Sequence, residues 1–421
     1  MAPNKTRSPI FPGWFVLAGA FCILFTVHGA RTIIGVVFKP MIQELAWSRG
    51  DLSTAAFINL AVFALSLTVV GRYYDRYGAR RIIVGASLIL GVSYIAISRI
   101  HSLGAFYLLY GVCAALGFGG ASIPLFGALI SKWFHRHRGL AISLAFAGGC
   151  LGQYIIVPAA TQLVAALGWR QAFMVLGVLV LVVNLLLALL LIKEKPQDLG
   201  LQPFGLYRAK PLSPAKKGSG TATAGETAGD RNLRQAMGTS SFWFYLAVMF
   251  VCGGGDFLVL THLVPLVTDH GIAPTTAGNM LGWVGFFSLL GVLATGPLTD
   301  RYGNKRVVLA TFLMRTVIIL VVCRYQNLWA FYGFALAFGF TLLITAPITT
   351  TLLGKMYGFS HVGLISGFIT TIHHFSGGLW AWLGGAIFDA TGSYLLVFQL
   401  SAAAAFIAFL CSLMIREVRH T

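Results

Sequence analysis

Long apolar runs dominate the chain, and short polar segments separate them. Most runs hold about 20 residues, the length that an α-helix needs to cross a bilayer. Twelve such runs occur, near residues 14–38, 52–71, 81–99, 104–130, 139–167, 171–192, 242–267, 274–298, 307–323, 328–353, 362–387 and 391–415. Because lipid offers no partner to backbone N–H and C=O groups, the runs must be helices. Without alternating strand patterns, the sequence predicts an all-α membrane protein with twelve transmembrane helices.

Two loops carry nearly the same motif 225 positions apart. Residues Gly71–Arg81 read GRYYDRYGARR and residues Gly296–Arg306 read GPLTDRYGNKR, and each motif stands between two apolar runs. Pro40 and Pro265 keep the same offset. This predicts two parallel pseudo-repeats of six helices each. Such proteins work by rocking one half against the other around a site at the membrane midplane, so the architecture points to solute transport.

A polar stretch interrupts the apolar pattern in the middle of the chain. It contains PLSPAKKGSGTATAGETAGD, a composition typical of a flexible linker. The predicted domains are therefore an N-terminal six-helix half at residues 1–192, a cytoplasmic linker at 193–241 and a C-terminal six-helix half at 242–421.

Charge and cysteine content narrow the class of protein. The chain is 57% hydrophobic and 10% charged, whereas a soluble domain carries roughly 25% charged residues. The net charge of +18 could suggest nucleic acid, but most of the 30 Lys and Arg residues fall in alternate loops, as the positive-inside rule predicts. We therefore expect no nucleic-acid partner, a place in the cell (inner) membrane, and cytoplasmic N- and C-termini. All six cysteines lie in apolar runs, so we expect core residues and neither disulfides nor metal ligands.

Two motifs resemble known transporter families. The GxxxDRxGxRR loop is similar to the hallmark loop of the major facilitator superfamily, and the repeat and helix number agree with it over nearly the whole chain. Residues Trp133–Gly152 read WFHRHRGLAISLAFAGGCLG and resemble the pattern YFxKRRxLAxGxAxAGxxxG of the monocarboxylate transporters and oxalate/formate antiporters. The stretch KPQDLGLQPFG after the sixth run also looks like bacterial members of that group.

The resemblance implies a twelve-helix secondary transporter, with one departure. Those families usually carry an Arg in the eighth helix, where this chain has the uncharged segment NMLGWVGFFSLLGVLATG. The substrate identity of the family is therefore not carried over to this chain.

Three charged residues lie well inside predicted helices: Arg31, Asp256 and Arg315. Charge inside a bilayer is costly, so each is a functional candidate. Arg31 and Asp256 are 225 positions apart on the first and seventh helices, which by resemblance to the superfamily line the central cavity. We expect them to face each other, with Arg31 binding a substrate carboxylate and Asp256 taking the coupled proton once Arg31 is claimed. The alternative is a permanent salt bridge. Arg315, on the peripheral ninth helix, is expected to be a structural charge, paired in the bundle or snorkelling.

Three polar residues are expected to support substrate binding. His28 lies on the same helical face as Arg31. His373, in the eleventh helix, stands where the oxalate/formate antiporters carry a substrate-binding Lys, and a neutral His can donate to a carboxylate or relay a proton. Gln153 follows a glycine cluster in the fifth helix and is expected to face the cavity. A histidine held in helix packing is the alternative at His28 and His373, and His262 and His374 are weaker candidates.

The two repeated loops are expected to gate the cytoplasmic side. Their acidic residues accept hydrogen bonds from helix N-termini and from Arg of the same loop, and such a latch breaks in the inward-open state. The predicted gating residues are Asp75, Arg76, Arg80, Asp300 and Arg301.

The sequence thus predicts proton-coupled symport of a small organic anion, most simply a monocarboxylate, by alternating access. The expected partners are that anion, a proton and the lipid bilayer, and the chain is expected to act as a monomer. No Walker-type GxxxxGK[ST] occurs, so ATP drive is not expected. We expect no enzymatic activity, no cofactor and no metal. The alternatives are an efflux transporter for amphipathic compounds, a carboxylate exchanger without proton coupling, and a non-transporting membrane sensor or assembly partner.

Overall fold

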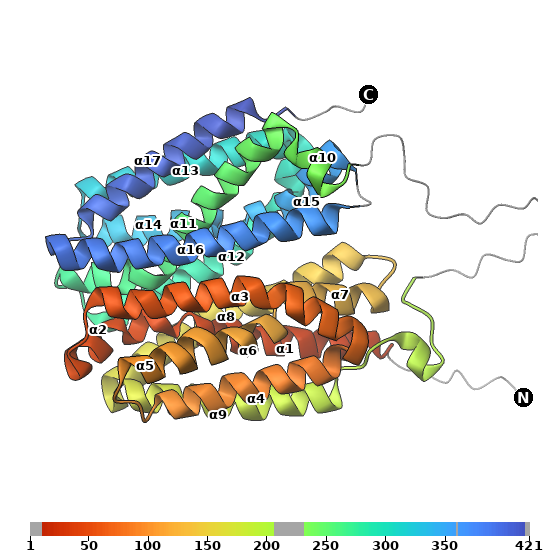
Figure 1. The fold of residues 1–421 in the computed structure, drawn as a ribbon, viewed down its shortest axis with the longest axis horizontal. Coiled ribbons are helices and arrows are strands. Elements are labelled where there is room, and N and C mark those ends of the chain that lie inside the picture. The colour runs from red at the N-terminus through yellow and green to blue at the C-terminus, as the bar shows by residue number, and fades with distance from the viewer. Residues whose placement is uncertain (1–10, 206–230, 359–360, 417–421) are drawn as a thin grey trace, which may run out of the picture.

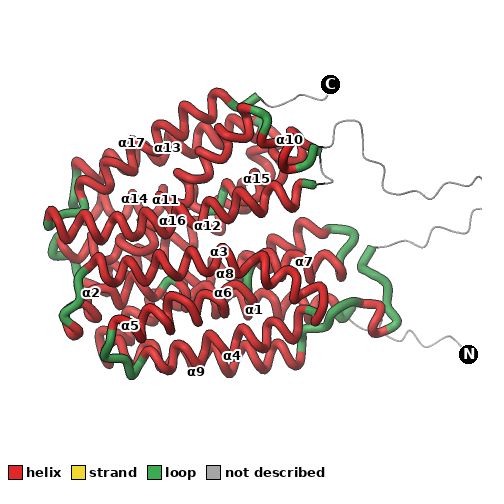
Figure 2. Tube along the Cα trace, viewed as in Figure 1, coloured by secondary structure: helices red, strands yellow, loops and turns green. Residues whose placement is uncertain are grey.

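The structure, a computed structural model, describes residues 11–205, 231–358 and 361–416. Within these ranges the chain is helical, and loops occur mainly at the two ends of the helix bundle (Figure 2). The helices are α1 (Gly13–Arg31), α2 (Ile33–Leu45), α3 (Arg49–Tyr77), α4 (Ala79–Ile97), α5 (Leu103–Phe106), the π-helix η1 (Tyr107–Ala114), α6 (Ala115–Gly120), α7 (Ile123–Trp133), α8 (Arg138–Leu167), α9 (Trp169–Leu190), the 3₁₀-helix η2 (Pro196–Leu199), α10 (Leu233–Met237), α11 (Ser240–Asp269), α12 (Pro274–Tyr302), α13 (Asn304–Arg324), α14 (Leu328–Leu342), α15 (Thr345–Tyr357), α16 (Val362–Thr391) and α17 (Leu395–Met414).

Eleven stretches of the described residues are long and apolar enough to cross a membrane. They coincide with eleven of the twelve predicted runs. The remaining run forms α16, a helix of 30 residues that is less apolar because it contains two histidines and several Gly, Ser and Thr residues. The all-α membrane architecture is therefore confirmed.

The helices form two bundles that lie side by side (Figure 1). The first bundle contains α1–α9 around one continuous apolar core, and the second contains α11–α17. Of two further core clusters, one lies in the second bundle and the other also includes Val36 of α2 and Val157 of α8. The predicted linker at 193–241 contains η2 and α10, and residues 206–230 of it lie outside the described part of the chain. The predicted domain boundaries themselves stay predictions.

The two ends of the molecule differ in how closely the bundles approach. We call the end at which α1 begins and α17 ends the terminal end, and the opposite end the distal end (Figure 1). The bundles meet through α3 against α16 and α8 against α12. A Cβ added at Gly385 of α16 would lie only 2.5 Å from the Arg49 carbonyl oxygen of α3, and one at Gly285 of α12 would lie 3.0 Å from the Cys150 carbonyl oxygen of α8. Glycine therefore permits the close approach of these backbones.

The bundles part toward the terminal end. Gly71 of α3, Gly296 of α12 and Gly367 of α16 have nothing within 4 Å of the position that a Cβ would occupy. Aromatic side chains near the end of α3, such as Tyr73 at 50% exposure, are open to the surroundings. Contact between the bundles is thus concentrated in the middle and at the distal end.

The first membrane-crossing stretch is broken in its middle, at Thr32. The backbone N–H of Thr32 donates to the His28 carbonyl at 3.3 Å, and the Thr32 hydroxyl donates to the same carbonyl at 2.9 Å. Although these bonds follow the helical i→i−4 pattern, α1 ends at Arg31 and α2 begins at Ile33. A similar break separates α14 from α15 in the second bundle.

Candidate functional site

Arg31 lies in the last turn of α1, near the middle of the stretch Gly13–Leu45. The C-terminus of a helix carries a partial negative charge, which stabilises a cation there by about 0.3–1 kcal/mol. Because α2 begins only one residue later, at Ile33, its partially positive N-terminus offsets this effect, so the break at Thr32 does not by itself compensate the charge of Arg31.

The Arg31 guanidinium is surrounded by aromatic rings. Its Cζ lies 4.0 Å from the ring centroid of Phe63, 5.3 Å from that of Phe118 and 5.6 Å from that of Phe257. Its Nη2 is buried without a hydrogen-bond partner, and no carboxylate of the described residues forms an ion pair with it. Cation–π contacts offset only part of the cost of removing this charge from water. Arg31 is therefore a cation that can accept an anion.

Asp256 lies in the middle of α11 and contacts three side chains of the second bundle. Its Oδ1 is 2.8 Å from Nη2 of Arg315, its Oδ2 is 3.2 Å from Nε2 of His373, and the Cys252 thiol donates to Oδ2 at 3.5 Å. Asp256 is 4% exposed and Arg315 is 2% exposed, so the pair is shielded from solvent. We call Cys252, Asp256, Arg315 and His373 the Asp256 cluster.

The expected pairing of Arg31 with Asp256 is wrong for this structure. Asp256 forms its ion pair with Arg315 of α13, in the same bundle. The long side chain of Arg315 reaches the carboxylate without crossing to the first bundle. Arg315 is accordingly paired within the bundle, one of the two placements expected for it.

Arg31 and the Asp256 cluster are nevertheless joined by a bridge of rings. The Phe257 centroid lies 5.5 Å from that of His374 and 6.2 Å from that of His373, and the same ring faces Arg31. His374 also lies 4.9 Å from Phe63, the closest aromatic neighbour of Arg31. Side chains of α1, α3, α11 and α16 thus meet where the two bundles face each other.

The other two predicted substrate ligands have different surroundings. His28 packs against α8, with its ring atoms 3.1–3.4 Å from the position of a Cβ on Gly149. Gln153 donates from Nε2 to the Leu281 carbonyl at 3.1 Å and is buried between α8 and α12. The structure therefore brings His373 close to the midplane charges, keeps His28 one turn from Arg31, and places Gln153 in the contact between the bundles.

Acidic and basic residues join the bundles at the distal end. The guanidinium of Arg49, at the start of α3, donates to both carboxylate oxygens of Asp269 at 2.7 and 2.9 Å, and Lys39 forms an ion pair with the same carboxylate. The backbone N–H groups of Arg49 and Gly50 donate to Asp389 at 3.1 and 2.7 Å. Because Asp269 and Asp389 belong to the second bundle, these contacts, which we call the distal network, hold the distal end closed.

The predicted gating residues lie at the terminal end without a latch between them. Among the described residues, Asp75 and Asp300 form no hydrogen bond or ion pair, and both are exposed. In this structure Glu194, and not Asp75, accepts from the N–H groups at the start of α4, those of Ala79 and Arg80, at 2.8 Å each. The gating role of Asp75 stays a prediction, because the latch is expected to be broken in the inward-open state. The guanidinium of Arg80 donates to the Leu189 carbonyl at 2.7 Å. Arg76 and Arg301 instead lie over the neighbouring tyrosine rings.

One group of side chains has donor atoms close enough for a metal ion. The ligand atoms of Cys252, Asp256 and His373 lie within 4.8 Å of one another. The guanidinium of Arg315 already contacts both Cys252 and Asp256. A metal ion would have to displace this cation, so we assign no metal to the group.

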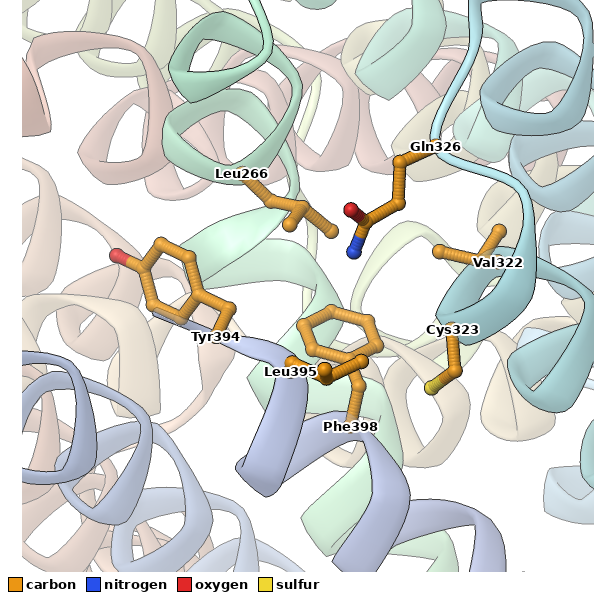
Figure 3. A pocket seen from close by; sticks show the side chains of 7 residues that line it. All are labelled: Leu266, Val322, Cys323, Gln326, Tyr394, Leu395 and Phe398. Atoms are coloured by element: carbon orange, nitrogen blue, oxygen red, sulfur yellow. The ribbon is translucent and has the colours of Figure 1, made fainter. Parts of the chain in front are cut away.

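Two hollows of the described residues lie away from the midplane charges. One cavity of about 10 Å³ lies between α11, α13 and α17 (Figure 3), too small for more than a single water molecule. In Figure 3 the Tyr394 hydroxyl points away from the other lining side chains, and it contacts Nδ1 of His262 at 3.1 Å. A hollow of about 360 Å³ lies between α8 and α12, beside Tyr154 and Trp283.

Sequence reasoning missed several of these partners. The rings around Arg31 belong to a set of 32 phenylalanines, and nothing in the sequence distinguishes them. The partnership of Arg315 with Asp256 had one signal, since both are charged residues in apolar runs. The distal network was signalled more weakly in the sequence, by the position of its charged residues at the ends of the apolar runs.

Comparisons with known proteins agree with this architecture. The family model of the Major Facilitator Superfamily matches residues 20–270 and 245–421. The chain is 24% identical to the "Uncharacterized MFS-type transporter YcxA" of Bacillus subtilis, over 97% of this chain and 98% of that protein. It is 26% identical to monocarboxylate transporter 11 of Homo sapiens, over 93% and 80% of the two chains, and 24% identical to monocarboxylate transporter 12-B of Danio rerio, over 96% and 88%. A bacterial homolog of the human lysosomal transporter Spinster, solved in an inward-facing and unoccupied conformation, has a similar fold, with a TM-score of 0.71 at 17% identity over 97% and 98% of the chains.

Proposed function

Because the chain belongs to the major facilitator superfamily, and is thus an integral membrane transporter and not an enzyme, we propose that it moves a small organic anion together with a proton. The proposed substrate is a monocarboxylate and the proposed mode is symport. The names of the monocarboxylate transporters among its relatives support this substrate class.

The observation that carries the proposal is the unpaired Arg31. A guanidinium offers a planar fork of N–H donors that matches a carboxylate, and a charge-assisted hydrogen bond contributes about 1.5–3 kcal/mol. Arg31 lies at mid-height, is partly exposed between the bundles, and has an Nη2 without a partner. The ring bridge with His373 and His374 lies in the same region, and His28 stands one turn before Arg31 on α1. Gln153 would act less directly, through the contact between α8 and α12.

The proton is proposed to bind within the Asp256 cluster. Asp256 and His373 are in contact at 3.2 Å, and both are close enough to Arg31, through Phe257, to sense a bound anion. An anion beside Arg31 adds negative charge and so favours a proton on this pair. Because binding free energies are reciprocal, the proton equally favours the anion.

Alternating access would exchange one closed end for the other. With the terminal end in the cytoplasm, as the distribution of Lys and Arg favours, the structure corresponds to an inward-open arrangement: the distal network is closed and the terminal ends are apart. In the outward-open arrangement the loops with Asp75, Arg76, Arg80, Asp300 and Arg301 would come together and act as the opposite gate.

Lumenal pH in proteoliposomes tests the proposal. The purified chain is reconstituted with a pH-sensitive dye, and formate, acetate, lactate, pyruvate and oxalate are added in turn, with protein-free liposomes reporting passive entry of the acids. We expect acidification above the passive rate with at least one monocarboxylate. Replacement of Arg31 by Gln should lower the initial rate at least about tenfold, because a charged hydrogen bond is lost.

Arg99→Gln is the matched control, since Arg99 is an exposed arginine in the distal loop between α4 and α5. It should acidify at the wild-type rate. Uptake of labelled acid without acidification would replace symport by exchange. No acid transported, with apolar amines or dyes extruded instead, would contradict the proposal and favour efflux of amphipathic compounds.

A further inference from the structure

We propose that His373, and not Asp256, carries the coupled proton, and that Arg315 is a positioning residue that keeps Asp256 ionised. The inference rests on the proposed function, because it assigns the proton of that symport to one group. It differs from the simpler expectation that the buried carboxylate takes the proton.

The environment of Asp256 favours a permanent negative charge. Arg315 is 2% exposed, and arginine keeps its proton in proteins. Its Nη2 lies 2.8 Å from Oδ1 of Asp256, and among the described residues no other carboxylate forms an ion pair with it. A proton on Asp256 would leave a buried guanidinium uncompensated, which is strongly unfavourable.

Arg315 is also fixed in place by the groups around it. Its Nε donates to the Thr341 hydroxyl at 3.1 Å, its Nη2 donates to the Thr341 carbonyl at 2.9 Å, and its Nη1 donates to the Cys252 thiol at 3.5 Å. All of these partners belong to the second bundle. The Asp256–Arg315 pair can therefore move with that bundle as a unit and stay neutral overall.

His373 has a ring nitrogen whose lone pair faces no cation, whereas Oδ1 of Asp256 faces the Arg315 guanidinium at 2.8 Å. Its Nε2 faces Oδ2 of Asp256 at 3.2 Å, which assigns the N–H of the neutral ring to Nε2. Its Nδ1 is buried without a hydrogen-bond partner. The side chain as a whole is 14% exposed, against 6% for Asp256. An incoming proton binds the Nδ1 lone pair, Nε2–H continues to donate to Asp256, and no other bond breaks.

The charges that face His373 make this proton depend on the substrate. The titratable and charged groups around it are Asp256 and Cys252 of α11, Arg315 of α13, its neighbour His374, and, across the ring bridge, Arg31 and His28 of α1. Arg315 already balances the negative charge of Asp256, so this charge does not offset the positive charge of Arg31. The charge of Arg31 therefore opposes the binding of a proton to His373. A carboxylate on Arg31 removes that opposition, so anion and proton bind together.

Two transport assays on the full-length protein in proteoliposomes separate the candidates. The first measures accumulation of the labelled carboxylate that acidifies the wild-type lumen most, driven by a pH gradient. The second measures exchange of the same acid at equal pH on both sides. His373→Gln should reduce accumulation to the level seen without a gradient and retain exchange. His373→Arg, with a fixed charge, should exchange at a rate independent of pH.

The double variant Asp256→Asn with Arg315→Gln removes the balanced pair and keeps His373. We expect it to retain gradient-driven accumulation. If it stays folded and exchanges but no longer accumulates, Asp256 is the proton carrier and the inference is overturned. A wild-type protein that neither acidifies nor accumulates any acid would instead overturn the proposed function and the inference with it.

The positioning role of Arg315 has its own readout in the pH profile. Arg315→Gln removes a cation beside Asp256 and His373, so the pH of half-maximal uptake should move to higher pH. Arg315→Lys should restore the wild-type value. Arg324→Gln, at the exposed end of the same helix, should leave it unchanged. A purely structural Arg315 would lower the yield of folded protein without moving the profile, which would contradict this role.

Discussion

Two arginines lie at mid-height in the molecule, and their surroundings give them different roles. Arg315 has an ion pair with Asp256 and hydrogen bonds to Thr341 and Cys252, so its charge and its N–H groups are compensated. Arg31 has only aromatic faces instead. A buried charge without a partner is costly. An anion beside Arg31 would supply the ionic partner that Arg315 already has, which is why we propose Arg31 as the binding residue.

A conservative change at Arg31 tests how that anion is held. Arg31→Lys keeps the charge and loses the planar fork, so one hydrogen bond to a carboxylate should be lost. The KM for the carboxylate should rise about tenfold and kcat should stay nearly constant, because the bond contributes to ground-state binding. Uptake kinetics in proteoliposomes measure both values. A fall in kcat at unchanged KM would contradict this role.

The midplane residues were predictable as a set but not as pairs. Any Arg or Asp in an apolar run is exceptional, so the sequence alone identifies Arg31, Asp256 and Arg315. The repeat offset suggested that Asp256 would pair with Arg31. Asp256 instead pairs with Arg315, whose long side chain spans the distance between α13 and α11. The spacing of residues along the chain does not predict such a contact.

At the scale of helices, close contact at the distal side depends on glycine. The backbone of α16 at Gly385 approaches Arg49 and Ser53 of α3 so closely that a Cβ has no space. A Cβ added at Gly296 of α12, in contrast, would have no other atom within 4 Å. The same residue type therefore serves packing at one position and leaves open space at the other.

This contrast gives a matched pair of variants. A Gly→Ala change inside a helix is by itself stabilising by about 0.5–1 kcal/mol. Gly385→Ala adds a clash with the Arg49 carbonyl, and overpacking costs about 1–3 kcal/mol. Thermal unfolding in detergent should therefore show a lower Tm for Gly385→Ala and an equal or higher Tm for Gly296→Ala. Equal Tm values for the two variants would mean that the distal contact contributes little to stability.

The helices themselves were predictable where composition decides them, and their interruptions were not. Apolar runs of about 20 residues marked the membrane-crossing stretches. The break at Thr32 leaves no such mark, since both flanking segments are apolar and Thr32 has the unremarkable dihedral angles φ −81° and ψ −5°. The sequence therefore could not show that Arg31 stands at a helix end.

At the scale of the whole molecule, the arrangement is closed at one end only. The distal network connects α2 and α3 of the first bundle to α11 and α16 of the second, whereas the terminal ends lie apart. The repeat predicted the two bundles correctly. It could not predict which end is closed, because a transporter populates both arrangements from one sequence and their free energies differ by a few kcal/mol.

Loosening the distal network should shift this balance. Arg49→Gln removes a two-point contact with Asp269 and a stacking contact on Phe388, where the guanidinium carbon lies 3.5 Å from the ring centroid. The arrangement that is open at the distal end should then be more populated. Hydrogen–deuterium exchange followed by mass spectrometry should report faster exchange at residues 46–54 and 385–395. Exchange should slow at 71–81 and 296–306, where the terminal loops come together.

Arg170→Gln distinguishes this shift from a general loss of charge at the distal end. Arg170 forms an ion pair with Glu44 at 2.9 Å, and both residues belong to the first bundle. Its loss should speed exchange locally and leave the terminal loops unchanged, because the pair is the same in both arrangements. Opposite changes at the two ends are the signature of one rigid bundle rocking against the other. Faster exchange at the distal end of Arg49→Gln with no change at the terminal loops would show local fraying, and the distal network would then not be a gate.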